Sequence, residues 1–260
     1  MTVDNKRSIF LASGNIIFMT SLKKICLGLL LSTLVSCSTG YHNDGNAVSY
    51  KSWNEGNGGH EDKLDADPAT FKILRFDDYA KDDRVVFYKG EIITGADAGT
   101  FEAIEEFYAR DKNRGYYGKD PVKGSDGKTF TVINAYYSRD QKDIYYEIDP
   151  LHTVNPEGFK FVHGKDDFQC WTTDGHYYYY NQYKVPSEEY ADLTIYEKSG
   201  GLSKDKHWVY WLDHKLNFDE DGKKVLDTID VASFIVTGYL ECSDKYGCFN
   251  VDHGREKCKN

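Results

Sequence analysis

The sequence between residues 97 and 117 reads DAGTFEAIEEFYARDKNRGYY, and a close copy, DGKTFTVINAYYSRDQKDIYY, occupies residues 126–146. One phenylalanine returns at intervals of 30, 29 and 29 residues: Phe71, Phe101, Phe130 and Phe159. One aspartate returns every 29 residues, at Asp82, Asp111 and Asp140, and each is followed five and six positions later by a pair of aromatic residues. A fixed period of this length indicates a stack of similar structural units rather than an enzyme built around one pocket.

The first half of each copy follows the pattern Asp-x-x-Thr-Phe-x-x-Leu/Ile, as in residues 67–74 and 97–104. Aspartate is a good N-cap, Pro68 suits a first helical position, and apolar residues three apart share one helix face. We therefore expect a helix of one to two turns. Because so short a helix is unstable alone, its apolar residues should be buried in neighbouring structure: Phe71, Leu74, Phe101, Ile104, Phe130 and Ile133.

The second half of each copy predicts a β-hairpin. A polar Asp-Lys-Asn type segment stands between aromatic and β-branched residues, as in residues 108–117, which is typical of a hairpin turn. In the second strand, Val86 and Tyr88 should share one face while Phe87 points to the other. The expected fold is mainly β with short helices, a solenoid-like tandem array of β-hairpin repeats of about 29 residues each.

The N-terminal segment has the features of a secretion signal. From Met19, the expected true start, two lysines precede eleven mostly apolar residues that end at Val35. This length fits a signal-peptide core and falls short of the roughly 20 residues that span a bilayer. The ending, Leu-Val-Ser-Cys37, resembles the lipobox of bacterial lipoproteins. The resemblance implies that Cys37 becomes the acylated (palmitate-carrying) first residue of a cell-envelope protein, and Ser38 after it favours the outer membrane.

Four segments are expected along the chain. They are a signal peptide (1–36), a lipidated tether (37–65), the repeat domain (66–219) and a degenerate C-terminal repeat with a cysteine-rich tail (220–260). A tether is indicated by the Gly, Asn and charged residues of the second segment. A degenerate first repeat is the alternative, because three of its residues reproduce the offsets of the later units: Tyr41, Asp44 and Tyr50.

The remaining cysteines suggest disulfide bonds. Beyond the signal and Cys37, the chain has four: Cys170, Cys242, Cys248 and Cys258. An even number in an oxidising compartment indicates pairing, with three connectivities open.

The recurring segments YAKDDRVVFY, YARDKNRGYY and SKDKHWVYW resemble the DKNYY family of bacterial repeat proteins over about residues 66–215. Two later units depart from that pattern. Asp174-Gly-His replaces Asp-Lys-Asn, and the Gly-Ala-Asp linker becomes Val154-Asn-Pro or Val185-Pro-Ser. The resemblance implies stacked repeats and brings no activity or catalytic residue with it.

Catalytic chemistry is not indicated. The chain has no GxSxG, HExxH, P-loop or GxGxxG motif in a suitable context, so we expect no enzyme and no cofactor. His176 and His207 occupy positions that earlier units fill with Arg, Asn or Lys, which favours solvated turn residues. The recurring aspartates fit Asx-type turns better than paired catalytic carboxylates. A formal net charge of −10 argues against nucleic acid as a partner.

One segment carries a calcium hypothesis. Asn217, Asp219 and Asp221 alternate and precede a glycine, as in the first half of a calcium loop. The twelfth position of such a loop should be Glu and is Thr228, so an acidic hairpin turn is the simpler interpretation.

Aromatic residues are the remaining functional signal. Tyr and Trp suit both half-buried strands and stacking surfaces, and the second aromatic strand of each unit must place rings on opposite faces. Four tyrosines are the candidate exposed binding residues: Tyr116, Tyr145, Tyr179 and Tyr210. The expected function is a lipid-anchored envelope protein that presents a protein-interaction surface. The alternative is a module that binds cell-wall or surface carbohydrate.

Overall fold

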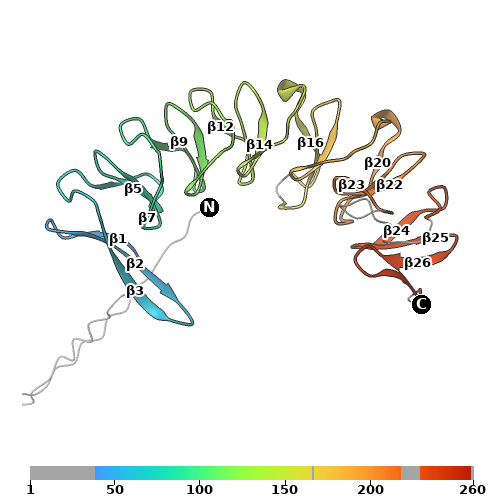
Figure 1. Ribbon diagram of the computed structural model, residues 1–260, viewed down its shortest axis with the longest axis horizontal. Helices are drawn as coiled ribbons and strands as arrows, with labels where there is room; N and C mark the ends of the chain where they lie inside the picture. The colour runs from blue at the N-terminus through green and yellow to red at the C-terminus, as the bar shows by residue number, and fades with distance from the viewer. Residues whose placement is uncertain (1–38, 166, 218–228, 259–260) are drawn as a thin grey trace, which may run out of the picture. The chain divides into compact units, whose positions relative to one another are not determined.

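A computed structural model describes residues 39–165, 167–217 and 229–258 (Figure 1). Seven small antiparallel sheets follow one another along this part of the chain, the first with three strands and the other six with four. Two short 3-10 helices precede the fifth and sixth sheets: η1 (Pro156–Gly158) and η2 (Tyr190–Asp192). The predicted tandem array of small β repeats is confirmed.

Within every sheet, each strand pairs with the next strand in sequence. The first sheet contains β1 (Gly40–Asn43), β2 (Val48–Asn54) and β3 (Gly58–Leu64). The second contains β4 (Lys72–Ile73), β5 (Tyr79–Lys81), β6 (Val86–Tyr88) and β7 (Glu91–Ile92). The third contains β8 (Glu102–Ala103), β9 (Tyr108–Arg110), β10 (Gly115–Tyr117) and β11 (Asp120–Pro121). The fourth contains β12 (Thr131–Val132), β13 (Tyr137–Arg139), β14 (Ile144–Tyr146) and β15 (Asp149–Pro150).

The last three sheets follow the same order. The fifth contains β16 (Lys160–His163), β17 (Trp171–Thr173), β18 (Tyr178–Tyr180) and β19 (Tyr183–Lys184). The sixth contains β20 (Thr194–Ile195), β21 (Leu202–Lys204), β22 (Val209–Trp211) and β23 (His214–Lys215). The seventh contains β24 (Ile235–Gly238), β25 (Glu241–Asp244), β26 (Gly247–Asn250) and β27 (Gly254–Glu256).

The two central strands of each four-stranded sheet form the predicted hairpin. In the third sheet, Arg110 of β9 pairs with Gly115 of β10, and the N–H of Asp111 donates to the carbonyl of Arg114 at 3.0 Å. The flanking strands have only two residues in most sheets. Alternation cannot be recognised in two residues, so the sequence does not reveal these outer strands.

The short helix expected at the start of each copy is present as one 3-10 turn in the fifth and sixth units, η1 and η2, and is wrong for the second to fourth units. Residues 67–70 form a single turn in which the N–H of Phe71 donates to the carbonyl of Asp67 at 2.9 Å. Asp67 also accepts the N–H of Ala69 at 2.9 Å, as an N-cap would. The chain then enters β4, which pairs with β5. Strand pairing therefore replaces the second helical turn, because one turn alone has little stability.

Hydrophobic clusters lie between neighbouring sheets, one at each of the six junctions. Tyr79, Val86 and Tyr88 of the second sheet pack against Phe101 and Tyr116 of the third. Phe87, one residue along from Val86, packs instead against the first sheet. The predicted alternation of faces is confirmed, and each sheet gives one face to the sheet before it and the other to the sheet after it.

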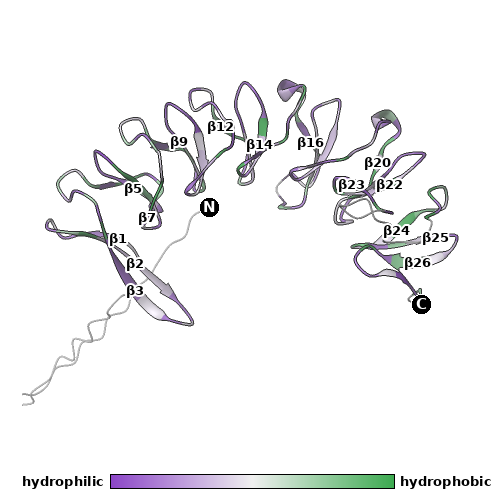
Figure 2. Ribbon diagram, viewed as in Figure 1, coloured by the Kyte–Doolittle hydropathy of each residue, from purple (hydrophilic) through white to green (hydrophobic). Residues whose placement is uncertain are grey.

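The phenylalanine and leucine positions of the repeat are buried to different degrees. Phe101 and Phe130 are buried, as expected. The other four expected core residues are only partly buried at the edges of the clusters: Phe71, Leu74, Ile104 and Ile133. Most of the ribbon is purple or pale, with green restricted to short segments such as β14 (Figure 2). This pattern fits cores that are built largely from tyrosine, whose polar hydroxyl lowers its hydropathy.

The first sheet belongs to the array. Tyr41 and Val48 pack against Ala80 and Phe87 of the second sheet, and the hydroxyl of Tyr41 donates to the carbonyl of Asp78 at 3.0 Å. A flexible tether therefore does not describe residues 40–64. The signal peptide, Met19 and Cys37 lie outside the described residues. Within the described ranges, no helix combines the length and apolar character needed to cross a membrane.

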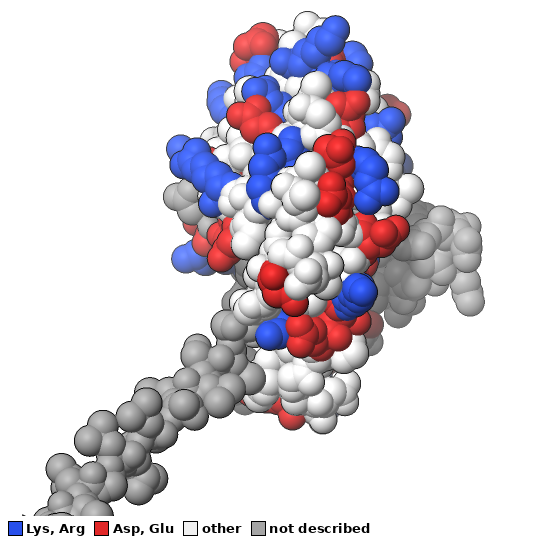
Figure 3. Space-filling view, turned by 90° about the vertical axis from the view of Figure 1, so that its left-hand side faces the viewer, with Lys and Arg blue, Asp and Glu red and all other residues white. Residues whose placement is uncertain are grey.

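The two end sheets turn polar faces outward. On the first sheet, the outward residues include His42, Ser49 and Lys63, and Figure 3 shows basic and acidic side chains interspersed on this side of the protein. On the seventh sheet, Glu241 and Asn250 pair across β25 and β26, where the second sheet pairs Tyr79 with Tyr88. Terminal units of a stack need such polar faces, because no further unit covers them.

Candidate functional site

A buried aspartate closes the hairpin turn of each regular unit. In the third sheet, Oδ1 of Asp111 accepts the N–H groups of Asn113 at 2.7 Å and Arg114 at 2.9 Å. Its Oδ2 accepts the N–H of Asp97, the first residue of the same unit, at 2.9 Å. Equivalent Oδ1 bonds occur at the other turn aspartates: Asp82, Asp140, Asp174 and Asp205. The predicted Asx-type turns are confirmed, and these carboxylates serve the fold.

The same hydrogen bonds keep the turn carboxylates ionised. Burial raises the pKa of Asp111, but the N–H donors of Asp97, Asn113 and Arg114 and the hydroxyl of Tyr116 outweigh burial. The pKa therefore lies below its ordinary value of 3.8. Four further turn aspartates shift in the same direction: Asp82, Asp174, Asp205 and Asp244.

The four tyrosines expected to form an exposed binding surface are buried instead. Each donates its hydroxyl to the turn aspartate five residues earlier, at 2.8, 2.9, 3.2 and 2.5 Å: Tyr116, Tyr145, Tyr179 and Tyr210. They cannot contact a ligand, because their face of the strand packs on the preceding sheet. Burial, together with the charged acceptor, raises the pKa of all four.

At several junctions, the residue just before the turn aspartate is basic, and its side chain reaches across to the next unit. The ammonium of Lys81 donates to the carbonyls of Ala98 at 2.5 Å and Phe101 at 3.0 Å, in the opening turn of the next unit. Lys204 makes the equivalent bonds to Val231 and Phe234, both at 3.1 Å, and Arg110 reaches the carbonyl of Phe130 at 3.0 Å.

The fifth sheet has Thr173 at this position. Its hydroxyl donates to the carbonyl of Tyr177 at 2.6 Å and accepts the N–H of Gly175 at 3.0 Å, so the side chain stays within its own turn. An open groove of about 1000 Å³ lies where the long basic side chain would have crossed. Residues of the fifth sheet and of the opening segment of the sixth unit line it, including Lys160, Thr173, His176, Tyr177, Lys184 and Tyr190.

Three aromatic rings gather in this groove. The ring centroids of His176 and Tyr177 are 4.4 Å apart, and those of Tyr177 and Tyr190 are 5.1 Å apart, both edge to face. The ammonium of Lys184 lies 3.8 Å from the centre of the Tyr177 ring. The Tyr190 hydroxyl donates to the carbonyl of Val185, and burial raises its pKa to about 12. The arrangement offers a stacking platform with cationic edges.

The sequence interpretation of His176 as an exposed turn residue agrees with the structure, where its N–H donates to Asp174 at 2.9 Å. Sequence reasoning missed Thr173, Tyr177, Lys184 and Tyr190. The signal was present in the departures of the fifth and sixth units from the repeat, namely Asp174-Gly-His and the linker that begins at Val185.

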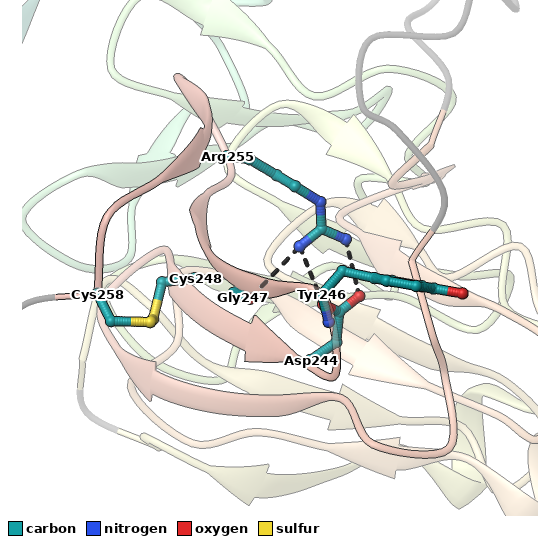
Figure 4. Close-up of a disulfide and its surroundings, with 6 residues drawn as sticks. All are labelled: Asp244, Tyr246, Gly247, Cys248, Arg255 and Cys258. Carbon is teal, nitrogen blue, oxygen red and sulfur yellow. Dashed lines mark hydrogen bonds and ion pairs between the residues drawn. A yellow bond between two sulfur atoms is a disulfide. The ribbon is translucent and has the colours of Figure 1, made fainter.

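Only one pair of the four cysteines forms a disulfide within the described residues. Cys248 bonds to Cys258 and ties the chain after β27 to β26 (Figure 4). Cys170 and Cys242 are buried free thiols in two different junction clusters, so the expectation that all four pair is wrong. Burial raises the pKa of both thiols, that of Cys242 to about 12.

Arg255 completes the seventh unit, in which Phe249 replaces the usual tyrosine and has no hydroxyl to donate. The guanidinium of Arg255 donates to both carboxylate oxygens of Asp244 at 2.9 Å (Figure 4). The calcium hypothesis is not decided by the structure, since Asp219 and Asp221 lie outside the described residues. Among the residues that are described, no group of three or more His, Cys, Asp or Glu side chains could hold a metal ion.

Comparison with known proteins identifies the family. No curated protein matches the chain, and neither does any solved structure. The model of the DKNYY family matches residues 2–120 and 108–253, two overlapping segments that together span most of the sequence. The repeated turn, hairpin and aromatic pair described above fall within these segments. The chain therefore belongs to the DKNYY family.

Proposed function

We propose that this chain is a non-enzymatic repeat protein of the cell envelope, anchored by lipid on Cys37, whose array presents a protein-binding surface. The lipobox-like sequence supports the anchor, and Ser38 supports an outer-membrane location. The recurring aspartates are the obvious candidates for acid–base chemistry among the described residues. Their carboxylate oxygens instead accept backbone N–H groups in the turns, as Asp111 does. A net charge of −10 argues against nucleic acid as the partner.

The single observation that carries the binding role is the groove between the fifth and sixth units. At the regular junctions the faces of the sheets are covered by their neighbours. At this junction, Thr173 leaves the space open, and Tyr177 and Tyr190 expose ring surface to it. Aromatic side chains of this kind supply much of the contact energy in protein interfaces.

Site-specific photo-crosslinking in the native envelope tests the proposal. A benzophenone side chain at Tyr177 should give a discrete protein adduct. The same probe at Tyr246, which is 56% exposed on the seventh sheet, is the matched control and should give none. Thr173→Lys restores the crossing side chain of the other junctions and should remove the Tyr177 adduct. No adduct at Tyr177, or equal adducts at both positions, would count against a protein partner in the groove.

A glycan is the second candidate ligand, because tyrosine rings bordered by polar groups also suit sugar stacking. Retention on purified peptidoglycan or surface polysaccharide separates the two candidates. If the groove binds a glycan, Tyr177→Ala and Tyr190→Ala should each release the protein from the polymer. Retention that is unchanged by both substitutions would exclude the groove as a sugar site.

A further inference from the structure

We infer that the groove between the fifth and sixth units accepts an acidic segment of a protein that also carries an aromatic or aliphatic side chain. The inference rests on the proposed function, since it takes the groove as the binding site, and it adds the chemistry of the partner. Three observations carry it: the charge of the groove, the position of one lysine over a ring, and the filling of the comparable junctions.

The groove is locally basic in an acidic protein. Lys160 and Lys184 line it on β16 and β19, the two outer strands of the fifth sheet. Neither forms an ion pair with any described carboxylate, whereas Lys206 nearby pairs with Glu189 at 2.6 Å. Glu188 is the one acidic residue in the groove lining. The chain as a whole has a formal charge of −10, so the attraction of an acidic partner has to come at short range from these two lysines, which also disfavour a basic one in the groove.

Lys184 also links charge to apolar contact. Its ammonium lies 3.8 Å from the centre of the Tyr177 ring, where a cation is attracted to the ring face. A partner carboxylate can meet this ammonium while an adjacent partner side chain packs on Tyr177 and Tyr190. The groove volume of about 1000 Å³ stands at the upper end of the roughly 300–1,000 Å³ of small-molecule pockets. It therefore has room for several residues of an extended segment.

Comparable junctions are closed to such a segment. Lys81, Arg110 and Lys204 extend across theirs and bond to carbonyls of the next unit. A partner would have to displace those bonds to enter. In the fifth unit Thr173 takes the place of the crossing cation and bonds within its own turn. Lys160 and Lys184 beside it remain available to a ligand.

Selection of peptides from a random display library on the full-length protein tests the inference. Enriched peptides should be rich in Asp and Glu and contain at least one aromatic or aliphatic residue. Their affinity should fall by about tenfold or more in Lys184→Gln and Lys160→Gln, and it should weaken as salt is raised. Lys63→Gln removes the same charge from the first sheet and should change the affinity less than twofold.

The outcomes separate this inference from the proposed function. Enrichment of basic or uncharged peptides would overturn the acidic partner even if Tyr177 crosslinks to a protein in cells. Acidic peptides whose affinity is unaffected by Lys184→Gln and Lys160→Gln would place the interaction elsewhere and overturn the groove as its site. A selection that yields no enriched peptide also counts against the inference, because a preformed groove should capture short segments.

Discussion

Turn aspartates are the residues on which every unit depends, and their ionisation links the fold to pH. The pKa of Asp82, Asp111, Asp174, Asp205 and Asp244 lies below 3.8 in the folded protein. A depressed pKa contributes stability that is fully present above the unfolded value of about 4. That stability is lost as the pH falls through the lower folded value.

The free energy of unfolding should therefore be nearly constant from pH 7 to about 5 and then decrease steeply from about pH 4 towards pH 2. Urea unfolding followed by tyrosine fluorescence across this range checks the expectation. Asp111→Asn removes one of the five titrating groups, so its curve should be lower at neutral pH and shallower below pH 4. A wild-type stability that does not change between pH 5 and 2 would contradict the role given to these carboxylates.

Gly115 shows how one residue is fixed by its neighbour across a junction. It stands where other units have Val86, Ile144 and Val209, yet a Cβ atom there would lie 2.4 Å from the ring of Phe130. Gly115→Ala should lower stability by about 1–3 kcal/mol through overpacking, although larger residues fit the same position elsewhere.

A double-mutant cycle measures this coupling. Phe130→Leu alone should destabilise, but in its presence Gly115→Ala should cost less than in the wild type, because the smaller side chain leaves room for the methyl group. If the stability losses of the two single substitutions simply add in the double mutant, the clash is relieved by movement of the backbone.

At the scale of the element, sequence patterns predicted the hairpins and missed the rest of each sheet. Residues 108–117 contain both strands of a hairpin and the turn between them, so the hairpin can be predicted from neighbouring residues alone. Whether residues 67–74 become a helix depends on a partner, β5, which pairs with β4. The opening turn and its Asp cap were predictable, but the replacement of a second helical turn by a two-residue strand was not.

The same limit applied to the candidate site. Strand alternation indicated that the paired aromatic residues face opposite ways, but in an array both faces are covered, so Tyr116 is buried rather than exposed. The groove forms because Thr173 is too short to cross the junction. The sequence alone does not reveal this, because the crossing of Lys81 and Lys204 is seen only in the structure.

The disulfide of the seventh sheet should stabilise that element. Cys248–Cys258 closes a loop between residues separated by 10 positions, and a loop of this size contributes about 2–3 kcal/mol in the chain-entropy model. Cys248→Ser and Cys258→Ser should each expose β27 to amide hydrogen exchange and leave the second and third sheets protected. Equal loss of protection in all sheets would show that the seventh sheet supports the whole array.

At the scale of the whole molecule, the proposed envelope location depends on Cys37. Cells grown with an alkyne fatty acid should label the wild-type protein and not Cys37→Ala. The substituted protein should then appear in the soluble periplasmic fraction, because the proposed acyl chains on this cysteine would supply the anchor. A Cys37→Ala protein that stays in the membrane fraction would point to retention of the N-terminal segment. A Ser38→Ala variant, with the cysteine intact, should label normally.

The placement of every hydrophobic cluster between two neighbouring sheets has a mechanical consequence. A pull on the two ends of the array loads its junctions in series, and no single core shares the load. Opening one unit releases about 29 residues, or roughly 100 Å of extended chain. Under tension the protein should therefore lengthen in repeated steps of similar size, as an extensible spring does, and not rupture in one event.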